Sequence, residues 1–293
     1  MEPAVVPHCS PGLDNKGRDR SGPIGVFDSG VGGLSVVRQV RQLLPGEDVL
    51  FLADQAHVPY GQRPLQAVRG FATAITRFLL GRDAKLVVVA CNTASAAALR
   101  HLRERFADTP FVGMEPAVKP AVLHTRTGVV GVLATPATFQ GALYASVVER
   151  FAQGVRVIQQ TLPGLVECIE AGDLDGPRTR RIVTAGVRPL IEQGADTLVL
   201  ACTHYPFVIP LIRAAAGPDV HVIDPSPAIA LQAERLLGER RALATPDRAG
   251  TLSLLTSGDA GTLCIMTSAL IGESAAAGRV TWEPDGEGLR HGD

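Results

Sequence analysis

Lysine and aromatic residues are scarce in this chain of 293 residues. There are only three lysines, Lys16, Lys85 and Lys119, among 28 basic residues. A pyridoxal phosphate enzyme needs a Schiff-base lysine, and the settings of these three lysines argue against that cofactor. Aromatic residues make up 4% and the net charge is −1. Base-stacking surface and a basic field are therefore both missing, and no nucleic acid partner is expected.

Long hydrophobic runs and paired cysteines are also absent. The longest apolar runs, such as 86–91 and 127–134, are much shorter than the ~18–20 residues that span a bilayer, so no membrane partner is expected. The N-terminal sequence lacks the charged-then-apolar pattern of a secretion signal. Five cysteines at wide spacing, without a CxxC pair, form neither a disulfide framework nor a zinc knuckle. These features favour a cytoplasmic location.

Short apolar runs alternate with amphipathic segments through most of the chain, which predicts parallel sheets covered by helices on both faces. Residues 1–23 are predicted to be a disordered N-terminal tail and residues 277–293 a C-terminal tail. The predicted strands cover 24–28, 49–53, 86–91, 111–114, 129–134, 155–159, 197–202, 220–223 and 252–256. The predicted helices cover 33–44, 64–80, 93–106, 139–151, 164–171, 177–193, 207–215 and 227–240.

A faint internal repeat runs through this pattern. KLVVVACNTAS (85–95) is similar to DTLVLACTHYP (196–206), and IGVFDSGVGG (24–33) is echoed by VGVLATPATF (130–139). The order of the two segment types is the same in both halves. The repeat predicts two similar α/β domains, with chance similarity between Val/Leu strands as the alternative.

Polar motifs follow several of the predicted strands, where ligands bind in open α/β sheets. The motif Asp28-Ser29-Gly30-Val31-Gly32-Gly33 follows the first strand. Its glycines allow a tight turn and close backbone approach, and the next helix presents free N–H groups to an anion. The spacing is not the dinucleotide fingerprint, and a structural turn capped by Asp28 is the alternative interpretation.

Two cysteines end predicted strands, in Cys91-Asn92-Thr93 and Cys202-Thr203-His204. A cysteine at such a place is often only a small apolar residue. Here both precede a predicted helix, and a helix N-terminus lowers the pKa of a thiol. His204 lies near Cys202, and Asp28 ends a neighbouring strand. Thiol, imidazole and carboxylate together suit acid–base or nucleophilic catalysis.

Two further loops offer groups for a ligand. Tyr60-Gly61 follows the second predicted strand, and a loop tyrosine beside glycine suits ligand contact, although a plain loop is the alternative. Thr135 and Thr138, in the second half, offer hydroxyls and backbone N–H groups to a carboxylate.

If the two predicted domains face each other with one thiol each, the arrangement favours one reaction class. Such a cleft suits removal of a proton from one face of a carbon and addition of a proton to the other face, which is racemisation or epimerisation. A small pKa shift makes thiol and thiolate both available near neutral pH. Because the Cα–H of an amino acid is a very weak acid, donors on the carboxylate and dry surroundings must stabilise the carbanion.

The chain resembles the glutamate racemases of the cofactor-independent aspartate/glutamate racemase family in motifs that occur in the family's order. The motifs are DSGVGGL (28–34), ADQAHVPYG (53–61), VVACNTAS (88–95), GVLATPATF (131–139) and ACTHYP (201–206), with LSLLTSGDA (252–260) similar to the C-terminal strand. The resemblance implies two Rossmann-like domains with the active site in the cleft between them. It also implies cofactor-free interconversion of L- and D-glutamate, which supplies D-glutamate for peptidoglycan.

The resemblance also implies residue roles. Cys91 and Cys202 match the acid/base residues on opposite faces of Cα, with Asp28 assisting Cys91 and His204 assisting Cys202. The family's further glutamate matches Glu170 rather than Glu167, in a segment that departs from the usual pattern because Leu162-Pro163 replaces a cysteine-proline pair. Ala201 also replaces a common glycine. The matches to substrate-binding residues are Asp28, Ser29, Tyr60, Gly61, Asn92, Thr93, Thr203 and His204.

The resemblance places residues 24–116 plus 226–276 in one domain and residues 117–225 in the other, and it allows a homodimer. Alternatives remain open. A relative could act on aspartate or another small acid by the same logic, since side-chain length changes pocket depth rather than motif type. A non-catalytic protein that closes on an amino acid and a Cys91–Cys202 redox switch are also alternatives. A metal site at Cys91, Cys202 and His204 is not expected, because His57 or Asp54 would have to supply a further ligand without a spacing signature.

Overall fold

The computed structural model describes residues 22–245, 247–286 and 288–292, so most of the predicted N-terminal tail lies outside the described residues. The strands are β1 Ile24–Asp28, β2 Val49–Ala53, β3 Leu86–Val89, β4 Phe111–Gly113, β5 Val129–Ala134, β6 Arg156–Gln160, β7 Thr197–Ala201, β8 His221–Ile223, β9 Leu252–Thr256, β10 Ala277–Trp282 and β11 Leu289–His291. The α-helices are α1 Leu34–Leu43, α2 Leu65–Leu80, α3 Asn92–Arg105, α4 Val118–His124, α5 Pro136–Gln140, α6 Ala142–Phe151, α7 Leu165–Glu170, α8 Pro177–Glu192, α9 Ile209–Ala216, α10 Ser226–Glu239 and α11 Ala260–Ile271. Short 3-10 helices are η1 Val31–Gly33, η2 Tyr60–Gln62 and η3 Tyr205–Val208.

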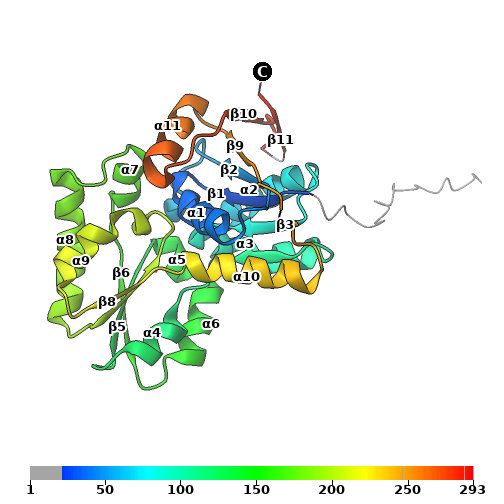
Figure 1. Cartoon of the computed structure of the whole chain (residues 1–293). Coiled ribbons are helices and arrows are strands. Elements are labelled where there is room, and N and C mark those ends of the chain that lie inside the picture. Colours follow the sequence, from blue (N-terminus) through cyan, green and yellow to red (C-terminus); the bar gives the residue numbers. More distant parts are fainter. Residues whose placement is uncertain (1–21, 246, 287, 293) are drawn as a thin grey trace, which may run out of the picture.

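The strands form two sheets, with the orders β11-β10-β9-β2-β1-β3-β4 and β6-β5-β7-β8. Neighbouring strands are parallel except β10 and β11, which are antiparallel. The segment β2-β1-β3-β4 has the same order as β6-β5-β7-β8. The predicted α/β class with two similar, mostly parallel halves is therefore confirmed. Figure 1 shows the two halves side by side, with α10 carrying the chain back to the first.

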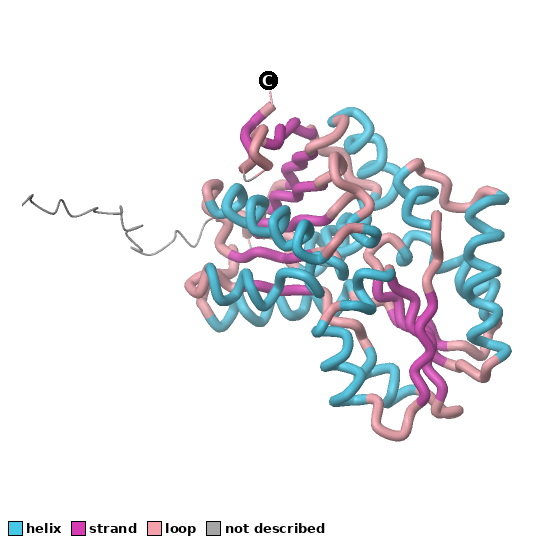
Figure 2. Tube along the Cα trace, turned by 180° about the vertical axis from the view of Figure 1, so that it is seen from behind, coloured by secondary structure: helices cyan, strands magenta, loops and turns pink. Residues whose placement is uncertain are grey.

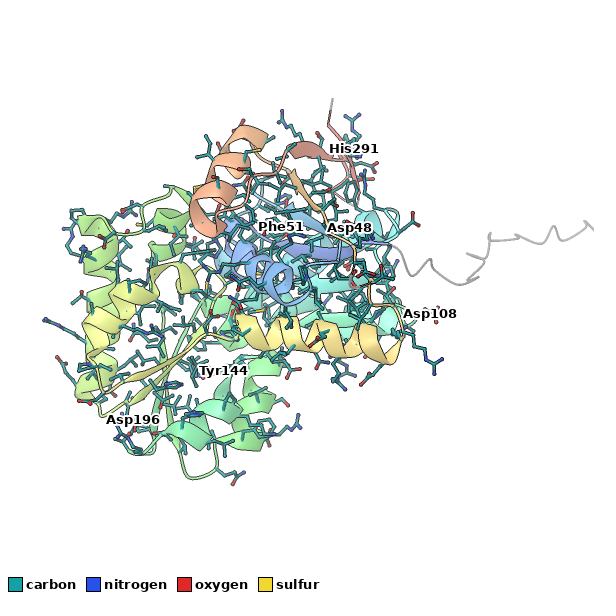
Figure 3. All side chains as sticks on the ribbon, viewed as in Figure 1. Asp48, Phe51, Asp108, Tyr144, Asp196 and His291 are labelled. Atoms are coloured by element: carbon teal, nitrogen blue, oxygen red, sulfur yellow. The ribbon has the colours of Figure 1, made fainter. Side chains whose placement is uncertain are left out.

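Buried apolar residues explain why the central strands form. In β1, β2 and β3 every residue is buried, which is typical of parallel strands covered on both faces. Alternate side chains enter different clusters: Val26 and Phe51 pack with α1, α10 and α11, whereas Phe27 and Leu52 pack with α2 and α3. Figure 3 labels Phe51 inside the first half.

The second sheet is covered in the same way. Val130, Val132 and Val199 pack with α4 and α6 on one face, while Leu133 and Leu200 pack with α8 and α9 on the other. Figure 2 shows this sheet with helices on both sides. The cluster under α8 and α9 continues into the cluster under α1, so one apolar core joins the two halves.

The C-terminal segment corrects one expectation. Residues 277–293 were expected to be a tail, but Ala277–Trp282 and Leu289–His291 extend the first sheet beyond β9. Among the described residues of this segment, only Val280 is fully buried, so the sequence carries little strand pattern. Neither α4 nor α11 was predicted from the sequence. The division into domains at 24–116 plus 226–276 and 117–225 stays a prediction.

Candidate active site

Both halves place loops at a topological switch point. In the strand order β2-β1-β3-β4 the chain adds β2 on one side of β1 and β3 on the other, so the strand order reverses between β1 and β3. Ligands bind outside the carboxyl ends of strands at such a point. Asp28 ends β1 and Cys91 follows β3, whereas Thr135 and Cys202 follow β5 and β7. A cavity of about 20 Å³, the room that one water molecule needs, lies where the loops meet. Its lining is Ser29, Pro59, Tyr60, Gly61, Cys91, Asn92, Thr93, Thr135, Val166, Cys202, Thr203 and His204.

Cys91 occupies the N-cap of α3. Its sulfur accepts a hydrogen bond from the Ala94 N–H at 3.4 Å, and its side chain is buried. Burial, together with the charge of Asp28, raises the pKa of Cys91 well above its usual value, and the Ala94 N–H opposes this only in part. Burial also raises the pKa of Asp28, although the positive charge of His204 and a hydrogen bond from Thr203 act in the opposite direction. The Cys91 thiol is therefore held in its protonated form.

Cys202 does not cap a helix as Cys91 does, although the helix predicted over 207–215 is present a few residues further on. A turn and η3 follow, and α9 begins only at Ile209. Its partner is the His204 imidazole, with Nδ1 3.8 Å from the sulfur and Nε2 2.6 Å from Glu170 Oε1. Burial alone would lower the pKa of His204, but the hydrogen bonds with Cys202 and Glu170 raise it well above its usual value. A positively charged imidazole therefore lies beside the Cys202 sulfur.

Glu170 joins the second half to the glycine-rich loop of the first. Its Oε1 accepts the Val31 N–H at 2.8 Å as well as the His204 contact. Burial raises the pKa of Glu170, but the hydrogen bond and charge of His204 and the Val31 N–H outweigh burial and lower it. The structure thus places Glu170, not Glu167, against His204. Glu167 instead accepts a hydrogen bond from Gln62 at 3.1 Å.

The glycine-rich loop provides space for these side chains. A Cβ atom on Gly30 would overlap the Glu170 carboxylate, and one on Gly32 would overlap the His204 imidazole. The anion that the loop binds in this structure is the chain's own Glu170 carboxylate, at the Val31 N–H. Glycine is needed here for close approach of the two halves rather than for a phosphate.

Hydroxyl groups from both halves meet on another side of the cavity. Thr93 Oγ1 lies 2.9 Å from Thr135 Oγ1 and 3.3 Å from Thr138 Oγ1, and the last two are 2.9 Å apart. Thr203 Oγ1 donates to Asp28 Oδ2 at 2.8 Å, and the Ser29 hydroxyl donates to Asp28 Oδ1 at 3.1 Å. The structure therefore brings together every one of these predicted hydroxyl residues.

Asn92 and Tyr60, both at the cavity, differ in whether their polar groups already have hydrogen-bond partners. The Asn92 amide is buried, and neither Nδ2 nor Oδ1 has a hydrogen-bond partner within the described residues. An unpaired buried amide costs about 1–3 kcal/mol, which a bound ligand would recover. Tyr60 differs, because its hydroxyl donates to Asp54 at 2.6 Å. Its ring and the adjacent Gly61 line the cavity, but its hydroxyl is already engaged.

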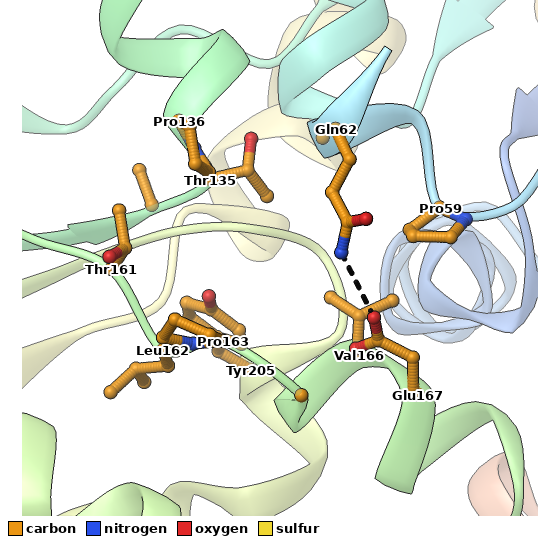
Figure 4. A pocket seen from close by; sticks show the side chains of 13 residues that line it. Pro59, Gln62, Thr135, Pro136, Thr161, Leu162, Pro163, Val166, Glu167 and Tyr205 are labelled. Carbon is orange, nitrogen blue, oxygen red and sulfur yellow. Dashed lines mark hydrogen bonds between the residues drawn. The ribbon is translucent and has the colours of Figure 1, made fainter.

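A second pocket of about 200 Å³ adjoins the cavity and shares Pro59, Gly61, Thr135 and Val166 with it. Figure 4 shows Gln62 and Glu167 meeting across this pocket. No sequence signal pointed to Val166 or Gln62, because an apolar residue and a loop amide carry no chemical pattern. Among the described residues, no group of three or more His, Cys, Asp or Glu side chains is arranged to hold a metal ion. The described helices include none with an apolar stretch of the length that a bilayer span requires.

Comparison with known proteins identifies the family. The model of the Asp/Glu/Hydantoin racemase family matches residues 24–233. A glutamate racemase from Ectopseudomonas mendocina (strain ymp) is 52% identical over 253 residues, 86% of this chain and 96% of the relative. The crystal structure of glutamate racemase isoform RacE1 from Bacillus anthracis has a TM-score of 0.81 at 30% identity, over 88% of this chain and 97% of that one. The structure of glutamate racemase from Francisella tularensis subsp. tularensis SCHU S4 in complex with D-glutamate has a TM-score of 0.77 at 28% identity, over 87% and 95%. The chain belongs to the Asp/Glu/Hydantoin racemase family.

Proposed function

We propose that this chain is a glutamate racemase that exchanges protons at Cα between Cys91 and Cys202 without a cofactor. One observation carries the proposal: both thiols line a single cavity, and each has its own titratable partner. The relatives support glutamate as the substrate, since the compared proteins are named glutamate racemases and one was solved with D-glutamate.

The two thiols act in opposite senses in one turnover. The Cys202 thiolate, beside the His204 imidazolium, removes the Cα proton from one face of the substrate. The Cys91 thiol gives its own proton to the other face. One proton is taken and one is given, so the enzyme is left with a Cys91 thiolate and a Cys202 thiol. The opposite enantiomer starts from that state, and Asp28 and His204 assist their respective thiols.

The remaining polar groups bind the substrate and stabilise its carbanion. The Asn92 amide offers a donor and an acceptor that no described residue uses, and the Thr93, Thr135 and Thr138 hydroxyls suit a carboxylate. In a dry site such donors stabilise negative charge more than they do in water. Because the cavity holds only about one water, glutamate enters when the two halves separate. The contact between Gln62 and Glu167 lies on that route.

The decisive experiment is circular dichroism of L-glutamate and, separately, D-glutamate, incubated with protein and reductant but without added cofactor. We expect both signals to decay to zero, because two enantiomers of equal free energy reach a 1:1 mixture. Decay with aspartate but not with glutamate would keep the reaction and change the substrate. No decay with any chiral acid, from folded protein, would contradict the proposal.

The cellular setting follows from the chemistry. We place the enzyme in the cytoplasm, because both thiols must stay reduced to exchange protons. There it supplies D-glutamate for peptidoglycan. The homodimer allowed by the family resemblance stays a prediction, which sedimentation of the purified chain would test.

A further inference from the structure

Asp54 gathers four hydrogen bonds beside the cavity, although it belongs to neither thiol pair. It follows β2 and is fully buried. Its Oδ2 accepts from the Tyr60 hydroxyl at 2.6 Å and contacts His57 Nδ1 at 2.9 Å. Its Oδ1 accepts from the Ser257 hydroxyl at 2.7 Å and from Trp282 Nε1 at 2.8 Å. One carboxylate thus connects a loop of the cavity wall to the C-terminal strand β10.

The loop that Asp54 holds has little regular structure of its own. Pro59, Tyr60 and Gly61 line the cavity, and only the three residues of η2 form a helical turn. The His57 ring stacks on Phe71 at 4.0 Å and meets the edge of Trp282 at 4.9 Å. Side chains distant in sequence therefore determine where this wall lies.

We propose that Trp282 is a positioning residue for this wall. Its indole N–H fixes the Asp54 carboxylate, and Asp54 in turn holds Tyr60 and the adjacent Gly61 against the substrate. Trp282 is the only tryptophan of the chain, and it lies in the segment whose sequence predicted only a tail. Hydrogen bonds to a buried carboxylate are stronger than neutral ones, and without the indole donor Oδ1 keeps only the Ser257 hydroxyl of its two donors. The kinetic consequences rest on the proposed racemase function, but the placement of the loop does not.

The first test needs no substrate. Trp282→Phe keeps an aromatic ring against His57 and Phe71 but removes the N–H donor. Leu289→Ala is the matched control, since Leu289 is the register partner of Trp282 on β11 and has no hydrogen bond to Asp54 among the described residues. We expect hydrogen exchange of the amides in residues 54–63 to become about tenfold faster in Trp282→Phe and to stay unchanged in Leu289→Ala.

The second test separates positioning from folding. Trp282→Phe should raise KM about fivefold for both glutamate enantiomers and change kcat less than twofold, because the thiol partners are intact. A purely structural role would reduce the folded fraction, which lowers kcat at constant KM. Normal loop exchange with a normal KM in Trp282→Phe would overturn the proposal, and so would equal effects in Leu289→Ala.

Two further outcomes are also decisive. If wild-type protein did not racemise glutamate, the proposed function would fail, while the exchange measurement would still decide the role of Trp282. If Trp282→Phe did not fold, Ser257→Ala would remove the other donor to the same Asp54 oxygen. Because the Ser257 hydroxyl also accepts the Ala56 N–H at 3.0 Å, the readout there is exchange at residues 57–63. Faster exchange at those residues supports the arrangement, and unchanged exchange overturns it.

Discussion

Cys91 and Cys202 follow equivalent strands in two halves of the same topology, yet their surroundings differ. Cys91 caps a helix and has a buried carboxylate, Asp28, as its titratable neighbour. Cys202 has no helix at its position and has the His204 imidazole 3.8 Å away. The carboxylate neighbour favours the thiol form of Cys91, whereas the neighbour of Cys202 is a cation. Two halves of the same topology therefore give their cysteines titratable partners of opposite charge, which suits the acid and the base of the proposed mechanism.

The loops after β1 and β5 differ in a complementary way. In the first half the glycines after Asp28 leave room for Glu170 and His204, which belong to the second half. In the second half Thr135 and Thr138 reach towards Thr93 of the first. Each half thus contributes side chains to the surroundings of the other. The difference between the surroundings of the two thiols therefore depends on how closely the halves approach.

Replacing either thiol should have the largest effect. Cys91→Ser and Cys202→Ser should each lower the rate of racemisation at least about 10³-fold, because a serine hydroxyl is a far weaker acid than a thiol. Circular dichroism of both enantiomers measures this loss. Turnover close to wild type in either variant would rule out the two-base mechanism.

Solvent deuterium sharpens the same comparison. The equilibrium constant of a racemisation is one, so kcat/KM must fall equally in both directions and cannot say which face each thiol serves. Exchange of the Cα hydrogen for solvent deuterium does distinguish the two faces, because this exchange needs only one base. We expect each single variant to exchange the Cα hydrogen of at most one enantiomer, with the two variants serving opposite enantiomers.

Closing the space between the halves should have the next largest effect. In Gly32→Ala the new Cβ would overlap the His204 imidazole and the Asp28 carboxylate, so both thiol partners must shift. A displacement of about 1 Å at a reacting group costs on the order of 10²-fold in kcat/KM. Gly70→Ala, where a Cβ meets open space within α2, is the control and should keep full activity. Equal activity of Gly32→Ala and Gly70→Ala would mean that the loop accommodates the added methyl group without displacing the thiol partners, and would contradict this prediction.

Removing Glu170 should affect only the Cys202 half. In Glu170→Gln the imidazole loses the carboxylate that helps to raise its pKa, so His204 gives up its proton at lower pH. The alkaline limb of the kcat/KM profile should therefore move to lower pH, with about a tenfold loss at neutral pH. Glu167→Gln, on the same helix but bonded to Gln62, should leave that limb in place. An unmoved limb in Glu170→Gln would contradict the role of the imidazolium.

The sequence predicted the strands well and their contacts poorly. All nine predicted strands are present as β1 to β9, because most of them are short, buried Val/Leu runs between turn residues. The same logic located Asp28, Cys91, Thr135 and Cys202, since residues that end parallel strands meet at one edge of a sheet. Glu170 was placed only through the family resemblance. The Asp54–Trp282 hydrogen bond spans 228 residues, and no local pattern marks it.

The smallest effect is expected at the amino ends of the strands, on the side of the sheets opposite the cavity. There Asp48 precedes β2 and Asp196 precedes β7, both labelled in Figure 3. Burial opposes ionisation of Asp196, but hydrogen bonds from Thr125 and from the Arg126 and Thr127 N–H groups together outweigh burial and lower its pKa to about 2. Burial also opposes ionisation of Asp48, but hydrogen bonds from Thr251, with Arg248, outweigh burial and lower its pKa. Carboxylates at this edge are thus stabilised as charges, in contrast to Asp28, whose pKa burial raises.

Asp196→Asn should therefore lower stability without affecting racemisation. Because the folded-state pKa lies below the usual 3.8, the carboxylate stabilises the fold fully above pH ~4, and this stability is lost as pH falls towards about 2. Asp196 is only half-buried and solvent screens it, so we expect a loss of about 1 kcal/mol in the free energy of unfolding at neutral pH. Urea unfolding of both proteins at pH 7 and near pH 2.5 measures the difference, which should shrink at the lower pH. A difference independent of pH would show that the introduced amide disturbs the turn by its shape rather than by its missing charge.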